Sequence, residues 1–177
     1  YKDISNLLSQ EIISTIDEKV YARYINRDYG NVRGITFTLN KLYSDLFSGS
    51  IDYTYQTAKG NASDPNAVFN DYNDNKEVEK QVLPLDWDQT HTLNTSLSIG
   101  KPGGVKVGLI GRFATGQPYT PSSPGSALDT QFENSDRKPA SYNFDLNLYK
   151  TVRFDKVKMK LYCKIFNLTD QLNQRYV

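Results

Sequence analysis

The sequence is poor in several features on which common protein classes depend. Its 177 residues include one cysteine, Cys163, and one histidine, His91. A single cysteine excludes an internal disulfide framework. The formal net charge of +1 provides no general attraction to nucleic acid or to an acidic partner. No apolar run approaches the roughly 20 residues of a transmembrane helix, so a helical membrane protein is excluded.

In several segments every second residue is apolar and the residues between are polar. One such segment carries Ile35, Phe37 and Leu39, separated by Thr36 and Thr38. The alternation recurs at Ile51, Tyr53 and Tyr55; at Leu93, Leu97 and Ile99; at Val105, Val107 and Leu109; at Tyr142, Phe144, Leu146 and Leu148; and at Val157, Met159, Leu161, Cys163 and Ile165. Alternation over about ten residues is typical of tilted strands that span a bilayer in β-barrels. Because such strands are only half apolar, a hydrophobic fraction of 38% does not exclude a barrel.

These segments and their turn residues predict seven strands. The strands cover approximately residues 1–8, 31–42, 47–58, 88–100, 104–115, 141–152 and 156–168, and a short extended piece is expected near 20–25. The connections are short at 43–46, 101–103 and 153–155 and long at 59–87 and 116–140. Outer-membrane barrels alternate short periplasmic turns with long extracellular loops in this way. The hairpins predict that Leu39 faces Ile51, Phe37 faces Tyr53 and Leu97 faces Val107.

Six segments carry a resemblance to a known family. They are 47–55 (FSGSIDYTY), 87–94 (WDQTHTLN), 116–121 (GQPYTP), 134–139 (NSDRKP), 145–150 (DLNLYK) and 166–170 (FNLTD). In this order and spacing they resemble the C-terminal barrel of TonB-dependent outer-membrane receptors. The resemblance implies a 22-stranded barrel filled by an N-terminal plug. It also implies active import of iron chelates (siderophores), vitamin B12 or glycans, with energy from TonB, ExbB and ExbD.

On this basis we expect an all-β chain, an antiparallel up-and-down transmembrane β-barrel segment with about seven of the 22 strands. Residues 1–177 would be a fragment of the receptor's barrel domain, without the plug, the TonB box and the final strand. The implied location is the outer membrane of a Gram-negative bacterium. The implied partners are outer-membrane lipid, the plug and remaining strands of the same receptor, TonB–ExbB–ExbD through the N-terminal part, and a nutrient.

No catalytic, cofactor or metal site is expected. His91 shares the apolar face of its strand with Leu93 and Leu97, whereas a catalytic histidine must face its substrate. The run that begins at Asp71 resembles a calcium loop, but Lys76 stands where an EF-hand needs glycine. We interpret this run as a solvated loop.

Charged residues are expected on the polar face of the strands, toward the barrel lumen. They are Asp52, Arg112, Asp145, Lys158, Lys160 and Lys164. Asp145 is expected near Lys164 and, on its other side, near Arg112. We interpret them as wall charges or contacts of the plug, in preference to a ligand path.

The long loops hold the candidate ligand-binding residues. They are Tyr72, Trp87, Tyr119, Asn134 and Arg137. Loops on rigid scaffolds carry recognition, and aromatic surfaces suit stacking on glycans or chelates. The alternative assigns Trp87 and Tyr119 to an outer aromatic girdle together with Tyr55, Phe113 and Tyr142. The girdle is favoured for Trp87, and neither interpretation is favoured for Tyr72.

Other functional classes remain open on sequence alone. A small closed outer-membrane barrel with a structural or adhesive role needs about eight strands, one more than predicted here. A soluble all-β carbohydrate-binding module would cover the apolar face with a second sheet. An outer-membrane hydrolase is disfavoured by the placement of His91.

Overall fold

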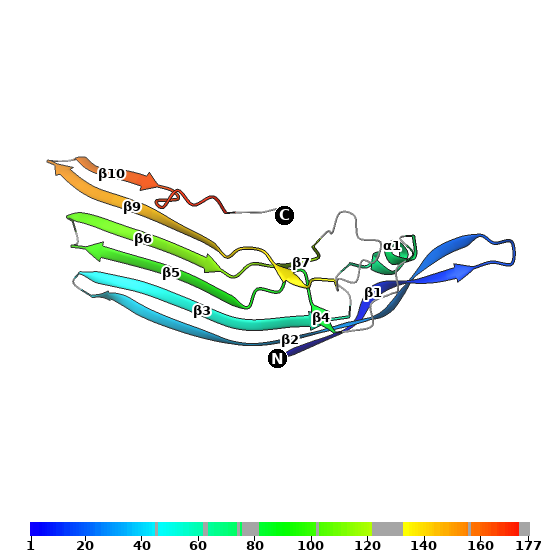
Figure 1. The fold of residues 1–177 in the computed structure, drawn as a ribbon. Coiled ribbons are helices and arrows are strands. Elements are labelled where there is room, and N and C mark those ends of the chain that lie inside the picture. Colours follow the sequence, from blue (N-terminus) through cyan, green and yellow to red (C-terminus); the bar gives the residue numbers. More distant parts are fainter. Residues whose placement is uncertain are drawn as a thin grey trace. The chain divides into compact units, whose positions relative to one another are not determined.

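The computed structural model describes residues 1–44, 46–61, 64–73, 75, 82–101, 103–121, 133–155 and 157–173. Seven long strands form one antiparallel sheet in the order β1-β2-β3-β5-β6-β9-β10 (Figure 1). Their bounds are β1 Lys2–Ser14, β2 Val20–Ser44, β3 Phe47–Gly60, β5 His91–Gly100, β6 Val105–Ala114, β9 Ser141–Phe154 and β10 Val157–Ile165. Each strand pairs with the next long strand along the chain. This confirms the predicted all-β, up-and-down architecture.

The N-terminal hairpin differs from the prediction. β1 continues to Ser14 instead of ending near residue 8, and β2 is continuous from Val20 instead of containing a short isolated piece. The pairing of β1 with β2 shifts register twice, on either side of Leu7, and Asn6 has a φ of 60°. Such irregularities exchange which face a residue occupies, so the two-residue alternation could not be recognised here.

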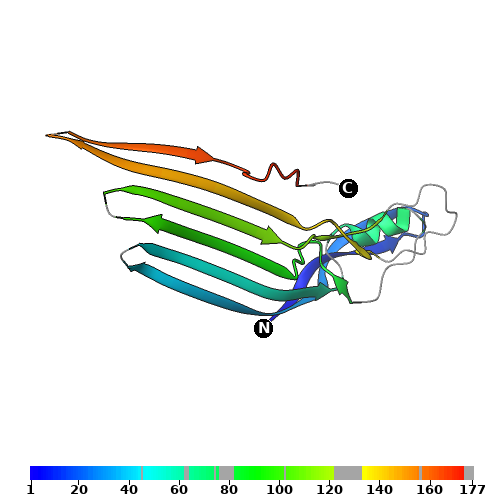
Figure 2. The same ribbon diagram turned by 60° about the vertical axis from the view of Figure 1, so that its left-hand side comes forward.

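The described residues form two compact units. Unit 1 comprises 1–34, 56–89 and 117–138, and unit 2 comprises 35–55, 90–116 and 139–177. β2 and β3 contribute residues to both units. In unit 2, β5, β6, β9 and β10 lie side by side in both views (Figures 1 and 2).

The strand pairs of unit 2 place apolar residues opposite one another. Leu97 faces Leu109, and Leu109 faces Leu146 on β9. The sequence predicts that Leu97 faces Val107, and this is wrong by two residues, because Val107 faces Ile99. Both pairs lie on the apolar face. The difference arises because the β5–β6 turn is centred on Gly103, whose φ is 79°. Between β2 and β3, the Thr36 and Thr54 hydroxyls lie 3.1 Å apart. This contact agrees with the predicted pairing of the residues that flank them.

The apolar face of unit 2 is uncovered. Ile35, Phe37 and Leu39 on β2 are 74%, 59% and 54% exposed. The buried apolar side chains of the described residues are Ala58, Val68 and Leu85, and all three belong to unit 1. A continuous exposed apolar face of this kind marks a surface that contacts lipid or another protein. In the part of the chain that the structure describes, no helix is long and apolar enough to cross a membrane.

Unit 1 also contains four short elements. They are α1 Ala67–Asn73, β4 Leu83–Pro84, β7 Pro118–Tyr119 and β8 Asp136–Arg137. β4 pairs with the end of β3, and β7 pairs with β8. Next to α1, the Asn66 Oδ1 atom accepts hydrogen bonds from Gln10 Nε2 at 2.9 Å and from the Tyr24 hydroxyl at 3.0 Å. These two contacts fix the start of α1 against the β1–β2 hairpin.

Candidate functional site

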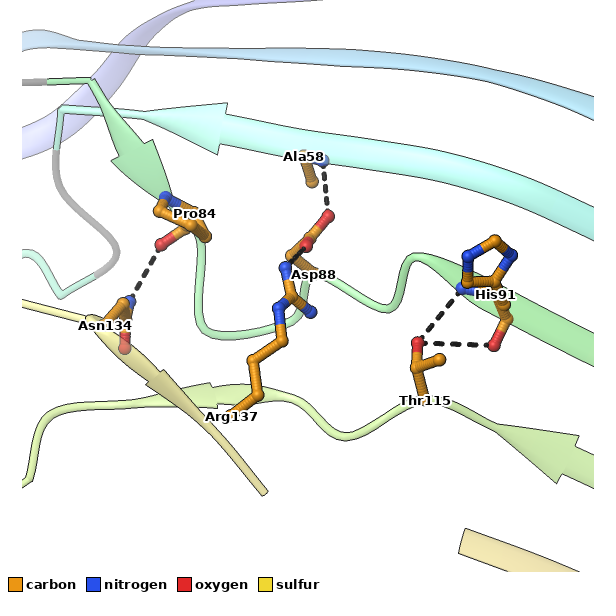
Figure 3. Close-up of polar contacts among 7 residues, drawn as sticks. All are labelled: Ala58, Pro84, Asp88, His91, Thr115, Asn134 and Arg137. Carbon is orange, nitrogen blue, oxygen red and sulfur yellow. Dashed lines mark hydrogen bonds and ion pairs between the residues drawn. The ribbon is translucent and has the colours of Figure 1, made fainter. Parts of the chain in front are cut away.

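Asp88 is the centre of a buried polar cluster in unit 1 (Figure 3). Its side chain is only 3% exposed, and Oδ1 accepts a hydrogen bond from the backbone N–H of Ala58 at 2.5 Å. The other carboxylate oxygen, Oδ2, forms an ion pair with the Arg137 guanidinium. A turn holds Asp88 in place, because its N–H donates to the Leu85 carbonyl at 2.7 Å. Asp88 therefore joins the end of β3 to the distant β8.

Asn134 makes a second link in the same unit. Its amide Nδ2 donates to the Pro84 carbonyl at 2.9 Å and to Asp86 Oδ1 at 2.7 Å. Its backbone N–H donates to the Thr120 hydroxyl at 3.0 Å. Asn134 is buried and has a φ of 56°, a left-handed conformation that asparagine tolerates better than most residues. We call Asp88, Asn134 and Arg137 the loop anchor, because they hold segments 83–88 and 133–138 together.

Tyr119 lies in the two-residue β7–β8 ladder, directly opposite Asp136. Its hydroxyl donates to Asp136 Oδ2 at 3.2 Å. This hydrogen bond, with smaller contributions from desolvation and from the negative charge of Asp136, raises the pKa of the Tyr119 phenol above its ordinary value. The phenol is therefore protonated at neutral pH and acts as the donor.

The structure brings three of the five predicted ligand-binding residues into one cluster. Asn134 and Arg137 use their polar groups to hold neighbouring segments, and Tyr119 is bonded to Asp136. Trp87 lies in the turn held by Asp88 and is 45% exposed, whereas Tyr72 is equally exposed on α1 and lies in no such cluster. Sequence reasoning missed Asp88, whose partner Arg137 is 49 positions away. The sequence feature that could have pointed to Asp88 is its place next to Trp87, in the family-like segment 87–94.

A cavity of about 630 Å³ in unit 1 was also not anticipated. Its lining includes Asp3, Asn31, Arg33 and Lys59. Asn31 Nδ2 donates to Asp3 Oδ1, and Arg33 Nε donates to Asn31 Oδ1 at 2.9 Å. The cavity therefore offers groups of both charges to a polar ligand.

The six predicted lumen charges of unit 2 share the face opposite the apolar one. Asp52 faces Asn94, Asn94 faces Arg112, and Arg112 faces Asn143. On β10, Lys158, Lys160 and Lys164 face Arg153, Thr151 and Asn147. No ion pair joins the six charges within the described chain. Asp145 faces Ile110, so it lies diagonal to both Arg112 and Lys164, and its Oδ1 accepts from the Asn167 N–H at 2.9 Å.

His91 belongs to the apolar face of unit 2, as predicted. Its Nδ1 lies 2.8 Å from the Tyr53 hydroxyl, and the Tyr55 ring centroid lies 5.3 Å from that of His91. Its backbone N–H donates to the Thr115 hydroxyl at 3.0 Å (Figure 3). These contacts make His91 part of an aromatic group with Tyr53 and Tyr55.

The interpretation of the run that begins at Asp71 as a solvated loop is wrong for its first three residues, which form the end of α1, Ala67–Asn73. Lys76 and Glu77 lie outside the described residues. Among the residues that are described, no group of three or more His, Cys, Asp or Glu side chains could hold a metal ion.

Comparison with known proteins supports the fold. No family model matches the chain, and no curated protein is significantly similar to it. A solved structure with a similar fold is the outer membrane transporter YddB from Escherichia coli, with a TM-score of 0.63 and 12% sequence identity. The match covers 96% of this chain and 25% of that one, so the chain spans about a quarter of the transporter. The sheet thus has the fold of a β-barrel segment.

Proposed function

We propose that the chain forms part of the wall and the extracellular loops of an outer-membrane receptor for TonB-dependent uptake of a scarce nutrient. The nutrient class is an iron chelate, a vitamin or a glycan. The likeness in fold to a part of YddB supports a role in transport, and the six family-like segments support the TonB-dependent class.

The observation that carries this proposal is the separation of the two faces of unit 2. One line of paired residues on its apolar face runs through Gly49, Leu97, Leu109 and Leu146 to Ile165 on β10. The neighbouring line on the other face runs through Ser50, Ser96, Ile110 and Asp145. Only lipid accepts an apolar face of this extent without a second protein layer.

The strand lengths agree with this environment. β3, β5 and β6 contribute residues 47–55, 91–100 and 105–114 to unit 2. Transmembrane strands need about 9–11 residues when they are tilted. We propose that unit 2 lies in the bilayer and that unit 1, which contains the long connections, is exposed outside the cell. The polar face of unit 2 would then line the lumen and contact the plug.

In unit 1 the loop anchor would hold the extracellular loops in a defined conformation. Trp87 and Tyr119 would be presented beside it for contact with the nutrient. An indole and a phenol give large contact areas at a small cost in side-chain entropy, which suits stacking on sugars and chelates. Asp88 and Arg137 would act as positioning residues and not as ligand contacts.

Growth and uptake experiments on the full-length protein test the proposal. The host strain, a strain without this gene and a strain without TonB are compared for uptake of labelled ferric chelates, cobalamin and oligosaccharides. We expect one of these classes to need both the gene and TonB. The Trp87→Ala variant should lower uptake of that nutrient, whereas Tyr21→Ala, at an exposed tyrosine of the β1–β2 hairpin, should not. Uptake that is independent of TonB would contradict the proposal.

A further inference from the structure

A shallow groove of about 280 Å³ crosses the apolar face of unit 2. Five of its lining residues lie on that face: Val105 on β6, Leu148 and Lys150 on β9, and Leu161 and Cys163 on β10. Lys150 faces Val105 on one side and Leu161 on the other. On this face the groove therefore presents four apolar side chains around one ammonium group, and Tyr149 and Tyr162 complete its lining.

The ammonium group of Lys150 has no hydrogen-bond or ion-pair partner among the described residues. A second lysine on the same face, Lys41 on β2, differs in this respect: it donates to the Ser44 hydroxyl at 2.9 Å and lies over the Phe47 ring. An isolated cation on a lipid-facing surface is unfavourable near the bilayer midplane and becomes favourable near anionic headgroups.

Lys150 lies in the half of β9 that leads to a short turn. It lies four residues before Phe154, where β9 ends and the short β9–β10 turn begins. Its neighbour Val105 is the first residue of β6, which follows the short β5–β6 turn. If the short turns are periplasmic, Lys150 lies on the inner-leaflet side, and its long side chain can reach the phosphate level.

We propose that this groove binds an anionic phospholipid of the inner leaflet. One acyl chain lies along Val105, Leu148, Leu161 and Cys163, and the headgroup phosphate binds the Lys150 ammonium. Charge complementarity selects an anionic over a zwitterionic lipid, since the groove offers one cation and no described acidic side chain. This inference rests on the proposed membrane location of unit 2.

Fluorescence quenching tests the site in the full-length protein with Cys163 as its single cysteine. A fluorophore on Cys163 reports quenching by brominated phosphatidylglycerol or brominated phosphatidylethanolamine in mixed vesicles. We expect phosphatidylglycerol to be preferred, and Lys150→Gln to reduce that preference roughly fivefold, as removal of one cation–headgroup contact predicts. Lys160→Gln is the matched control, because Lys160 faces Thr151 on the opposite face of the same hairpin.

The outcomes separate the two proposals. If neither lipid quenches the fluorophore, Cys163 does not face lipid, and both the membrane location and the groove proposal fail. If both lipids quench it equally in the unsubstituted protein, the membrane location stands and the lipid site is overturned. The lipid site is also overturned if Lys160→Gln reduces the preference as much as Lys150→Gln, because general positive charge would then explain it.

Discussion

At the scale of single residues, Asp88 holds distant segments of unit 1 together. Its carboxylate accepts from two donors, the Ala58 N–H and the Arg137 guanidinium, in a nearly water-free position. Hydrogen bonds to charged groups contribute about 1.5–3 kcal/mol, and a buried donor left without an acceptor costs a similar amount. The anchor therefore stabilises the loop conformation to an extent that surface contacts do not reach.

Replacement of Asp88 by asparagine should release the loops. The amide has one acceptor oxygen for two donors, and its NH₂ group would face a donor. We expect backbone amides of 57–59 and 135–138 to exchange hydrogen about ten- to a hundredfold faster in the full-length protein. The control is Glu11→Gln, which removes the exposed ion pair with Arg23 and should change exchange less than about fivefold. Equal effects of the two substitutions would show that Asp88 anchors nothing.

At the scale of elements, two adjacent residues of β6 lie on opposite faces of the sheet, one apolar and one polar. Leu109 faces Leu97 and Leu146, whereas Ile110 faces Ser96 and Asp145. Because side chains alternate along a strand, two neighbouring residues sample opposite environments within one backbone segment. This makes the strand a sensitive test of which face contacts lipid.

A lysine at position 109 should destabilise the protein much more than a lysine at position 110. Leu109→Lys places a charge in hydrocarbon at mid-strand, at a cost of about 2–4 kcal/mol. Ile110→Lys places the same charge beside Asp145 on the polar face, where we expect less than about 1 kcal/mol. Urea unfolding of the full-length protein in lipid vesicles measures both values. A larger loss for Ile110→Lys would mean that the faces are reversed.

At the scale of the whole molecule, the connections between strands determine which strand ends lie on which side of the membrane. The β1–β2 turn and the long connections follow one set of strand ends, and the β5–β6 and β9–β10 turns follow the other. In the proposed orientation the first set is outside the cell. Epitope tags inserted between Asp17 and Glu18 should therefore bind antibody on intact cells, while tags between Gly103 and Gly104 should bind only after the outer membrane is permeabilised. Labelling at Gly103 in unbroken cells would reverse the orientation.

The isolated chain should not behave as a soluble monomer. Its apolar sheet face is exposed, and β10 and β1 each lack a second neighbour in the described sheet order. Open strand edges and apolar surface of this extent cause aggregation in water. Expression of residues 1–177 without detergent is expected to yield insoluble protein. A monodisperse monomer with strand-type circular dichroism would favour a covered sheet and hence the soluble carbohydrate-binding alternative.

The limits of sequence reasoning follow from the same contacts. The sequence pairs Leu97 with Val107 because turn length sets register, but the turn is centred on Gly103, one position beyond the predicted centre. The sequence predicts too short a first strand because the register shifts of β1 interrupt the alternation. In contrast, the faces of Cys163 and Arg112 were predicted correctly, since an uninterrupted strand needs only its own period of two residues.

Beyond the N-terminal hairpin, the sequence by itself determined the strand order, the apolar and polar faces and the distribution of short and long connections. Each of these depends on residues that are neighbours in the chain, so a local pattern contains the information. Only the tertiary structure decided that Asp88 meets Arg137 and that Asn134 meets Pro84, 50 positions away. Loop residues have no periodicity, and their partners depend on how distant segments return to the end of β3. The tertiary structure therefore assigned Asn134 and Arg137, expected as ligand contacts, to the anchoring of loops.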